Sequence, residues 1–428
     1  MTRPRHRLDP GSNRAQSARV RGAAQKRGRL WPARYSRVPG LGHRRSRVAG
    51  NSASGAGREL GFFLKRLVVS GINLSEGGPL TVLRDFLRAA CSLPVDWEIV
   101  AMVHDRKLFD LPRVRFMEFR DSKSSWFRRL YYEYWHFHTL SQGMGVDVWV
   151  SLHDMSPRVV AQRQVVYCHQ GAPFYRMPLR AARHNPRFFL FTLLYRHLYR
   201  MNLHANDLIV VQQEWIRQEF RRMFGVCNIA VAHPIDEVPA HNPRTCPLGD
   251  RKVILYPALA RTNKNFETLC RAAAKVEQRL GSSDFEVRLM ISGEENSYSA
   301  GLRRQYGGIR SVKFLGWQPD QRMPQLYEEA SAIVFPSVQE TWGLPITEGK
   351  ALGKVLMLAD LPYAHEALGE YQRARFFDPL DADALADLII RHMSGEEIGV
   401  PHAAQPVRAP FAPNWAALVQ MVTGTSDE

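Results

Sequence analysis

Short apolar runs alternate with longer amphipathic stretches along most of the chain. Uninterrupted apolar runs of this length are typical of strands buried on both faces, and most of the intervening segments are long enough for a helix. The strands expected in the first half lie at residues 67–70, 97–103, 148–152, 165–168 and 208–211. Regular alternation of strands and helices predicts a parallel sheet with helices on both faces.

The same pattern restarts after a polar, proline-containing stretch at residues 239–249. The strands expected in the second half lie at 253–257, 287–292, 312–315, 332–335 and 355–358. Two such halves predict an α/β protein of two Rossmann-like lobes whose parallel sheets face each other across a cleft.

The domain boundaries follow from this pattern. The expected N-terminal lobe covers residues 61–240 and the C-terminal lobe covers 250–395. Residues 396–428 would form an extension whose short helix, at about 414–422, returns to the first lobe.

Most of the formal net charge of +17 belongs to the first 60 residues. They hold fifteen Lys and Arg and only Asp9 and Glu59 as acids, a net charge of +13, which leaves +4 for residues 61–428. Such a segment can bind nucleic acid or an anionic membrane, serve as a transit peptide, or be a disordered tail that is untranslated if the start lies downstream. Because it lacks an amphipathic period and enough apolar residues for a core, we expect a disordered tail and no nucleic-acid partner.

The remaining composition is that of a globular protein. Five scattered cysteines, without a Cys-x-x-Cys pair, argue against a disulfide framework or a zinc site and fit a reducing compartment. The longest apolar run, at 188–195, is far too short to span a bilayer. The expected location is therefore the cytoplasm, with peripheral contact at the inner face of the cell membrane left open.

The most informative stretch is residues 336–348, which directly follow the apolar run 332–335. Its Gly-Leu-Pro at 343–345 predicts a helix start, where free N–H groups and the helix dipole favour a phosphate. Glu348, one turn into that helix, can accept two hydrogen bonds from a vicinal diol such as a ribose, and Glu340 can reach a different hydroxyl. A phosphate site between two such carboxylates suits a nucleotide sugar.

A second polar loop, residues 256–265, follows the first strand of the second half. Open parallel sheets bind ligands at the carboxyl ends of their strands, so we expect this loop and the glutamates to share one site. Arg261 offers a fork of donors and Lys264 a point charge, which together suit a diphosphate without a metal. A solvated charged loop is the alternative, but the position beside the glutamates favours function.

Two candidates lie in the first half. Gly77 and Gly78 follow the first strand and would let a ligand approach the backbone closely, although any tight turn can contain such a pair. His169 ends the strand at 165–168. It can contact the transferred sugar or the acceptor, and a structural histidine is an equal alternative.

Two further patterns have ordinary explanations. Asp381-Ala382-Asp383 has the Asp-x-Asp form that some sugar transferases use to hold Mn²⁺ or Mg²⁺, but it precedes an amphipathic helix, so we interpret it as helix capping and expect no metal site. Residues 124–138 are dense in aromatics and arginine. They predict either a helix lying on a membrane or acceptor, which we favour slightly, or an aromatic core helix.

Together these stretches resemble the retaining glycosyltransferases of family 4, the glycosyl transferases group 1, which have the GT-B fold. The family's E-x7-E motif matches Glu340 to Glu348, its Pro-Ser matches residues 336–337, and its Phe-Gly-Leu-Pro appears as Trp-Gly-Leu-Pro at 342–345. The family run "fLG … lY … a … vfPS" matches positions within 314–337.

The resemblance also maps the basic residues and the first half. The family's phosphate-binding pair corresponds to Arg261 and Lys264, its first-lobe glycine loop to Gly77 and Gly78, and its first-lobe histidine to His169.

The resemblance covers about residues 64–395 and is strongest in the second half. Trp342 and Leu344, on either side of Gly343, are expected to contact the donor. Trp342 replaces the family's phenylalanine, which is a mild departure. Gly349 replaces its usual alanine and is expected to loosen the helix slightly.

What the resemblance implies is a nucleoside diphosphate sugar as donor, retention of the anomeric configuration, and neither metal nor other cofactor. Arg261, Lys264 and the backbone near Gly343 would stabilise the leaving diphosphate, Glu340 would hold the donor sugar, and Glu348 would hold the ribose. The expected acceptor is a glycan or lipid-linked glycan in surface polysaccharide synthesis. The alternatives are a nucleotide-sugar epimerase or phosphorylase of the same fold, and a catalytically silent nucleotide- or nucleic-acid-binding protein.

Overall fold

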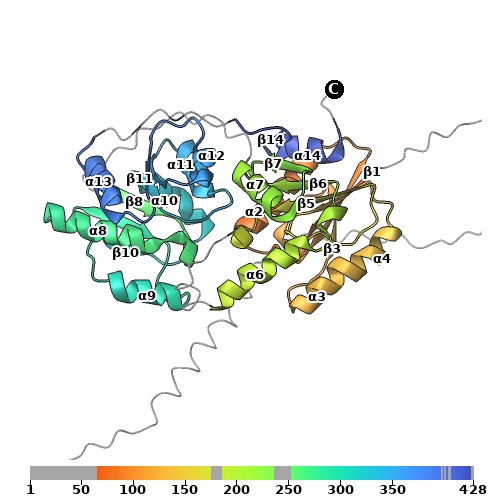
Figure 1. Ribbon diagram of the computed structural model, residues 1–428, viewed down its shortest axis with the longest axis horizontal. Helices are drawn as coiled ribbons and strands as arrows, with labels where there is room; N and C mark the ends of the chain where they lie inside the picture. The colour runs from red at the N-terminus through yellow and green to blue at the C-terminus, as the bar shows by residue number, and fades with distance from the viewer. Residues whose placement is uncertain are drawn as a thin grey trace, which may run out of the picture. The chain divides into compact units, whose positions relative to one another are not determined.

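A computed structural model describes residues 65–174, 186–235, 252–396, 399, 402 and 406–425 (Figure 1). The expected basic tail, residues 1–60, and the expected linker, 239–249, lie outside these ranges. Within them, no helix combines the length and apolar character needed to cross a bilayer.

The first sheet has eight parallel strands in the order β14-β7-β6-β5-β4-β1-β2-β3. Its strands are β1 (Lys65–Gly71), β2 (Trp97–Val103), β3 (Val114–Glu118), β4 (Val148–Ser151), β5 (Arg163–Cys168), β6 (Leu208–Val211), β7 (Ile229–Ala232) and β14 (Phe411–Ala412). Its helices are α2 (Gly77–Ala90), α3 (Trp126–Tyr131), a π-helical segment (Tyr132–His136), α4 (Phe137–Gln142), α6 (Pro186–Arg200), α7 (Glu214–Phe224) and α14 (Trp415–Thr423), with 3-10 turns at Arg106–Leu108, Ala172–Phe174 and Leu203–Ala205.

Helices cover both faces of this sheet because successive strand residues point to opposite sides. In β1, Leu67 and Val69 belong to a core shared with α2 and α14. Val68, between them, packs on the other face with residues of the π-helical segment and α4. Farther along that sheet, α6 and α7 pack against β5, β6 and β7.

The second sheet has six parallel strands in the order β10-β9-β8-β11-β12-β13. The strands are β8 (Lys252–Tyr256), β9 (Phe285–Leu289), β10 (Val312–Phe314), β11 (Ala332–Phe335), β12 (Val355–Ala359) and β13 (Ala374–Phe377). The helices are α8 (Phe266–Leu280), α9 (Ser297–Tyr306), α10 (Met323–Glu329), α11 (Leu344–Ala351), α12 (Pro362–Leu368) and α13 (Ala382–Met393), with 3-10 turns at Thr262–Lys264 and Asp320–Arg322.

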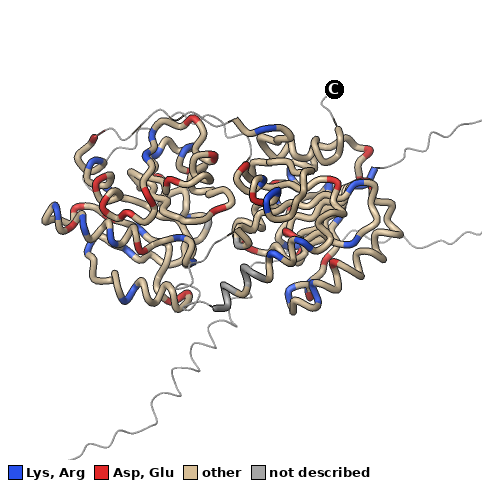
Figure 2. Tube along the Cα trace, in the orientation of Figure 1, with Lys and Arg blue, Asp and Glu red and all other residues tan. Residues whose placement is uncertain are grey.

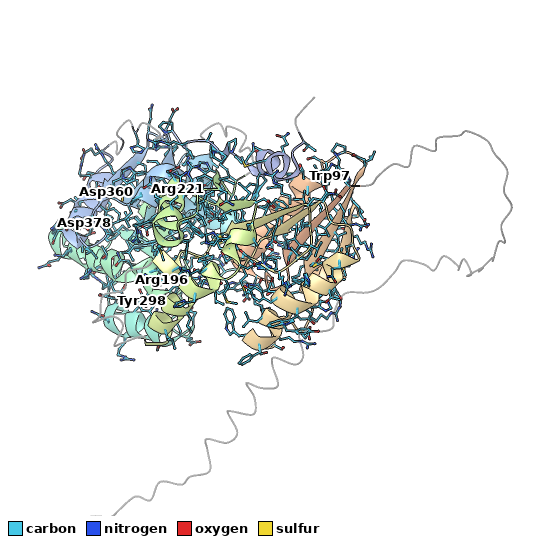
Figure 3. The ribbon with its side chains drawn as sticks, turned by 45° about the vertical axis from the view of Figure 1, so that its right-hand side comes forward. Trp97, Arg196, Arg221, Tyr298, Asp360 and Asp378 are labelled. Carbon is cyan, nitrogen blue, oxygen red and sulfur yellow. The ribbon has the colours of Figure 1, made fainter. Side chains whose placement is uncertain are left out.

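Acidic and basic residues are interspersed along the helices of both halves (Figure 2). Asp360 and Asp378, labelled in Figure 3, directly follow β12 and β13 and mark the carboxyl edge of the second sheet.

The predicted α/β class with two parallel sheets is confirmed, and every strand expected from an apolar run is present within one to three residues. The strands that the pattern missed are β3, β7, β13 and β14, of which β3, β13 and β14 lie at sheet edges. The last two elements of the chain return to the first sheet, where β14 pairs with β7 and α14 packs against α2.

The expectation that Gly349 loosens its helix is wrong. A Cβ atom at this position would lie 2.7 Å from Leu356 Cδ2 and 2.8 Å from Ile333 Cδ1, both in the buried core. The missing side chain therefore lets α11 pack closely on β11 and β12, a contact that outweighs the weak helix propensity of glycine.

Gly349→Ala should accordingly lower the free energy of unfolding by about 1–3 kcal/mol, since overpacking a dense core forces neighbouring side chains from their rotamers. Chemical denaturation would measure this loss. Gly301→Ala, in α9 and with open space around its Cβ position, is the control and should be neutral or stabilising. Greater stability of Gly349→Ala would show that the core accommodates the methyl group.

His392 is a buried group whose charge state the fold controls. It is 6% exposed, and its Nε2 lies 2.9 Å from Ser331 Oγ. Burial, together with the positive charges of Lys252 and Arg373, lowers the pKa of His392 from 6.5 to about 4. The imidazole is therefore neutral in the folded protein at neutral pH.

Because the folded pKa lies below the unfolded one, the folded state binds fewer protons between about pH 6.5 and 4, and stability falls as the pH drops through that window. His392→Gln keeps a partner for Ser331 but does not titrate. Compared with this variant, the wild type should lose about 3 kcal/mol between pH 7 and pH 4, at 1.36 kcal/mol per pKa unit. Urea denaturation at several pH values would measure the difference, and parallel curves for the two proteins would contradict it.

Candidate active site

The loops after β8 and β11 are bound to each other at the carboxyl edge of the second sheet. Val338 N donates to Asn263 O at 2.9 Å, and Asn263 Nδ2 donates to Gln339 O at 2.9 Å. The two polar loops singled out in the sequence, 256–265 and 336–348, are thus brought together.

The buried side chain of Asn265 holds these loops in place. Its backbone has φ +52°, a left-handed conformation that asparagine tolerates better than most residues. Its side-chain Nδ2 donates to Pro336 O at 3.0 Å and to Pro379 O at 2.7 Å, while Oδ1 accepts from Thr268 at 3.0 Å. The buried amide of Asn265 therefore connects the loops that follow β8, β11 and β13.

Two buried tyrosines add to this support. The Tyr256 hydroxyl donates to Lys264 O at 2.6 Å and lies 2.9 Å from Ser337 Oγ, and the Tyr363 hydroxyl donates to Ser337 O at 2.7 Å. Burial raises the pKa of both phenols well above the ordinary value, so both remain protonated donors. No pattern in the sequence indicated these roles.

Lys264 and Glu340 form an ion pair, with side chains 16% and 14% exposed. The Lys264 amine also lies 5.6 Å from the centre of the Phe335 ring. A ligand that binds either side chain must therefore separate the pair.

Arg261 is exposed at the start of the 3-10 turn that carries Lys264. Within the described part of the chain, its guanidinium has no hydrogen-bond or ion-pair partner. It is thus open to an anionic ligand beside the ion pair.

Glu348 lies in the first half of α11 and accepts a hydrogen bond from the Tyr327 hydroxyl. Burial by the surrounding protein raises the pKa of Glu348, and the hydrogen bond from Tyr327 opposes the rise. The residue is nevertheless exposed by surface area. A side chain in a concave position can be surrounded by protein and still meet solvent, so the Glu348 carboxylate remains accessible to a ligand.

The N-terminus of α11 is open. Gly343 precedes it with φ +89°, no side chain caps the helix, and proline occupies its first turn. A Cβ atom at Gly343 would lie 3.1 Å from Ile346 and 3.2 Å from Phe335, so glycine also allows the tight entry into Leu344.

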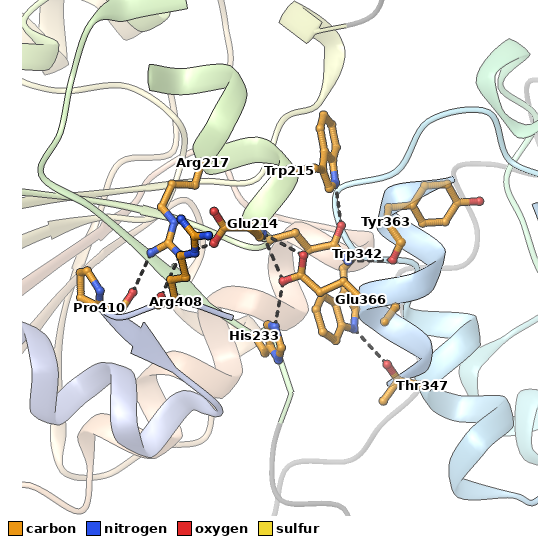
Figure 4. Close-up of polar contacts among 12 residues, drawn as sticks. Glu214, Trp215, Arg217, His233, Trp342, Thr347, Tyr363, Glu366, Arg408 and Pro410 are labelled. Atoms are coloured by element: carbon orange, nitrogen blue, oxygen red, sulfur yellow. Dashed lines mark hydrogen bonds and ion pairs between the residues drawn. The ribbon is translucent and has the colours of Figure 1, made fainter. Parts of the chain in front are cut away.

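Trp342, expected to contact the donor, instead packs internally in this structure (Figure 4). It is 4% exposed, its Nε1 donates to Thr347 Oγ1 at 2.9 Å, and its ring centre lies 4.4 Å from that of His233. The larger indole ring in place of phenylalanine thus reaches a residue that follows β7.

Glu366, in α12, caps the N-terminus of α7, a helix that is distant in the sequence. Its carboxylate accepts from the backbone N–H of Glu214, the first residue of α7, at 2.8 and 3.2 Å, and lies 3.1 Å from His233 Nε2 (Figure 4). Gln213 Nε2 donates to Tyr363 O at 2.9 Å in the same region. Nothing in the sequence distinguished Glu366 from an ordinary surface acid.

His169 is held by Asp154, a residue that the sequence did not reveal. Asp154 is 5% exposed, has φ +70°, and accepts from the backbone N–H of His169 at 2.6 Å. His169 Nε2 lies 3.6 Å from the same carboxylate. Two residues on, the Gly171 carbonyl accepts from the Gln339 side chain, so the His169 loop adjoins the loop of Glu340.

Gly77 and Gly78 form the exposed start of α2, where Glu76 provides no side-chain cap. Gly77 has φ +63°, a left-handed conformation that favours glycine, so the backbone accounts for the first of the two glycines. No atom lies within 4 Å of a Cβ at Gly78, so packing does not require the second.

A cavity of about 330 Å³ lies against Glu340 and is otherwise mainly aromatic and aliphatic; its lining residues are Phe174, Trp215, Val338, Gln339, Glu340, Leu361, Pro362 and Tyr363. A larger hollow, about 680 Å³, lies beside β9 and β10 and includes none of the candidate residues. Of the candidate residues, Glu340 lines the smaller cavity.

The capping interpretation of Asp381 and Asp383 is confirmed. Asp381 Oδ1 accepts from the N–H groups of Asp383 and Ala384 at 2.9 and 3.0 Å at the start of α13. Asp383 forms ion pairs with Lys275 and Arg279 at 2.8 and 2.7 Å.

Sequence and structure comparisons relate this chain to known glycosyltransferases. Residues 242–405 match the family Glycosyl transferases group 1. The O-antigen chain mannosyltransferase B of Escherichia coli is 31% identical over 20% of this chain and 22% of its own length. Matches to the other curated relatives likewise span less than half of each relative's length.

Solved structures support the fold over most of the chain. Sucrose-phosphate synthase from Thermosynechococcus elongatus superposes with a TM-score of 0.59 at 16% identity, covering 77% of this chain and 90% of that one. The Anabaena protein HepE, in complex with UDP-glucose, gives 0.56 at 14% identity, covering 84% and 95%. The chain thus has the GT-B fold, and its second half contains a Glycosyl transferases group 1 domain.

Proposed function

We propose that the protein is a retaining, metal-independent glycosyltransferase of family 4, which moves a sugar from a nucleoside diphosphate sugar to a glycan or lipid-linked glycan. The observation that carries this proposal is the gathering of Arg261, the Lys264–Glu340 pair, the open start of α11 and Glu348 at one sheet edge. Cationic groups for a diphosphate and carboxylates for hydroxyls are the recognition chemistry of such a donor.

Donor binding would exchange the partners of the ion pair. The diphosphate would take Lys264, with Arg261 and the N–H groups after Gly343 beside it. Glu340, released from the amine, would accept hydrogen bonds from the donor sugar, and Glu348 would accept them from the ribose. These cationic and dipolar groups act most strongly as charge develops on the leaving diphosphate, which lowers the barrier to its departure.

The acceptor would attack on the face from which the diphosphate departs, which gives retention. His169, whose loop adjoins that of Glu340, would contact the sugar or the acceptor. The Escherichia coli relative is an O-antigen chain mannosyltransferase, which supports surface polysaccharide synthesis as the setting. The location that we propose is the cytoplasm.

The donor class is tested by a panel of nucleotide sugars with product analysis, preceded by thermal shift with UDP, GDP and a random oligonucleotide. Transfer to a glycan with retained configuration supports the proposal. An epimerised donor, a released sugar 1-phosphate, or oligonucleotide binding without turnover would each point to one of the alternatives.

Variants of three residues should separate binding from catalysis. Lys264→Ala should lower kcat by on the order of 10²–10³, the usual loss for one contact to developing charge. Glu340→Gln should also lower kcat. Glu348→Gln should mainly raise the donor KM, because ribose contacts are the same in substrate and transition state.

The control for Lys264→Ala is Lys275→Ala, whose amine pairs with Asp383 on the surface. It should keep wild-type kinetics. Circular dichroism would confirm folding of all variants. Loss of turnover at saturating donor in Glu348→Gln, with an unaffected Lys264→Ala, would reverse the assigned roles.

Metal independence is a separate prediction. Arg261, Lys264 and the helix N-terminus can neutralise a diphosphate, so turnover should persist after treatment with EDTA. Asp383→Ala should change stability slightly and leave kcat intact, since Asp383 is occupied by Lys275 and Arg279. Activity abolished by EDTA and restored by Mn²⁺ would refute the prediction.

A further inference from the structure

An exposed aromatic stripe runs along the helical segment from α3 to α4. Phe127, Tyr131 and Trp135 are spaced four residues apart and are 85%, 46% and 63% exposed. Residues at this spacing lie on one side of a helix. The opposite side of the segment is buried, with Tyr132 8% and Phe137 0% exposed. These residues already anchor the segment to the core, so the exposed stripe is not needed for folding.

The neighbouring helix α6 has a similar stripe. Leu190 and Leu194, four residues apart, are 53% and 52% exposed. The helices meet where Trp126, itself 48% exposed, packs edge-on against Tyr195 with ring centres 6.5 Å apart. The apolar face is defined here as Trp126, Phe127, Tyr131, Trp135, Leu190 and Leu194. Grouped exposed apolar residues of this size mark interaction surfaces.

The charge around the apolar face is positive. Lys123, Arg196 and Arg200 lie on its two segments, 120–142 and 186–205. Arg196 is labelled in Figure 3. The acids within these segments are Asp121 and Glu133.

Neither acid offsets the charge of these three cations. Asp121 is already paired with Arg128 at 2.5 Å, so this pair is neutral. Glu133 is fully buried, and burial raises its pKa to about 8, although Arg129 opposes the rise. The two segments therefore carry a net positive surface charge, and neither of their carboxylates is both exposed and free.

We propose that the apolar face docks on an anionic lipid bilayer, with its aromatic and leucine side chains inserted at the interface and its cations against the head groups. Aromatic rings beside arginine and lysine have the chemistry of interfacial anchors. A glycan ligand would call for a concave site with carboxylates facing its hydroxyls, and this face presents exposed helices without them.

Docking would position part of the candidate active site, because α6 is bonded to the loop that contains His169. Arg196 Nε donates to Pro173 O at 2.8 Å, which ties α6 to the loop that contains His169. A bilayer-bound α6 would thus hold that loop near the membrane, where a lipid-linked acceptor is found. The docking itself does not depend on the proposed activity, and each can fail without the other.

The test is flotation of the full chain with phosphatidylcholine vesicles, with and without phosphatidylglycerol. The wild type should float with the anionic vesicles. The double variant Phe127→Ser/Trp135→Ser should bind about tenfold or more weakly, because it removes two inserted side chains. Trp317→Ser, at a tryptophan 72% exposed beside the second sheet, is the matched control and should bind like the wild type.

The basic residues 1–60 are present in all three proteins, so electrostatic binding through them would affect each equally. Quenching of tryptophan fluorescence by lipids with brominated acyl chains adds a direct readout of insertion. Quenching should fall in the double variant and persist in Trp317→Ser.

Failure of the wild type to bind anionic vesicles would overturn the proposal and leave a protein partner as the occupant of the face. So would equal binding of the double variant, which would assign the affinity to residues 1–60. Thermal melts of the variants would establish that each is folded, as expected for changes at exposed side chains.

Discussion

The candidate active site depends on one buried amide. Asn265 stands after the first strand of the second sheet, and its side chain reaches the backbones of two other strand-end loops. Since β8 and β11 are neighbours in the sheet, their carboxyl ends already lie together. Asn265 converts that proximity into a fixed geometry, and the left-handed backbone it tolerates turns the chain from the Lys264 loop into α8. The same geometry brings Lys264 and Glu340 together, with help from the Asn263–Gln339 hydrogen bond and from the buried tyrosines Tyr256 and Tyr363.

Except for β7, the interior strands could be predicted from sequence because they are buried on both faces and therefore apolar without interruption. β7 was missed although all four of its residues are buried and apolar. The edge strands β3 and β13 include Arg115 and Arg375, since one side meets solvent, and they lose that signal. In β14 only two residues pair, which is too short for any pattern.

The candidate site divides in the same way. Arg261, Lys264, Glu340 and Glu348 were identified because charged residues directly after buried strands stand out in the sequence. Asn265, which supports their loops, could not be identified, because it acts on segments brought near it only by folding. The same holds for Glu366, which binds the start of α7. Trp342 shows the converse: a residue beside the motif was assigned to the ligand, but its indole ring packs against His233. Adjacency in sequence identifies a loop, and burial decides which of its side chains face a ligand.

The pairing of Lys264 with Glu340 has a consequence for how the site stays ready in the absence of a donor. An unpaired charge in so enclosed a position would be costly, and breaking such a pair by removing one partner leaves the other uncompensated. A ligand that carries only a phosphate would pair with Lys264 and leave Glu340 without a partner. A ligand with sugar hydroxyls alone would bind Glu340 and leave Lys264 without a partner. A nucleotide sugar supplies both groups at once. In the proposed function, the ion pair would therefore favour the complete donor over either of its fragments, because of the desolvation cost of leaving one charge unpaired.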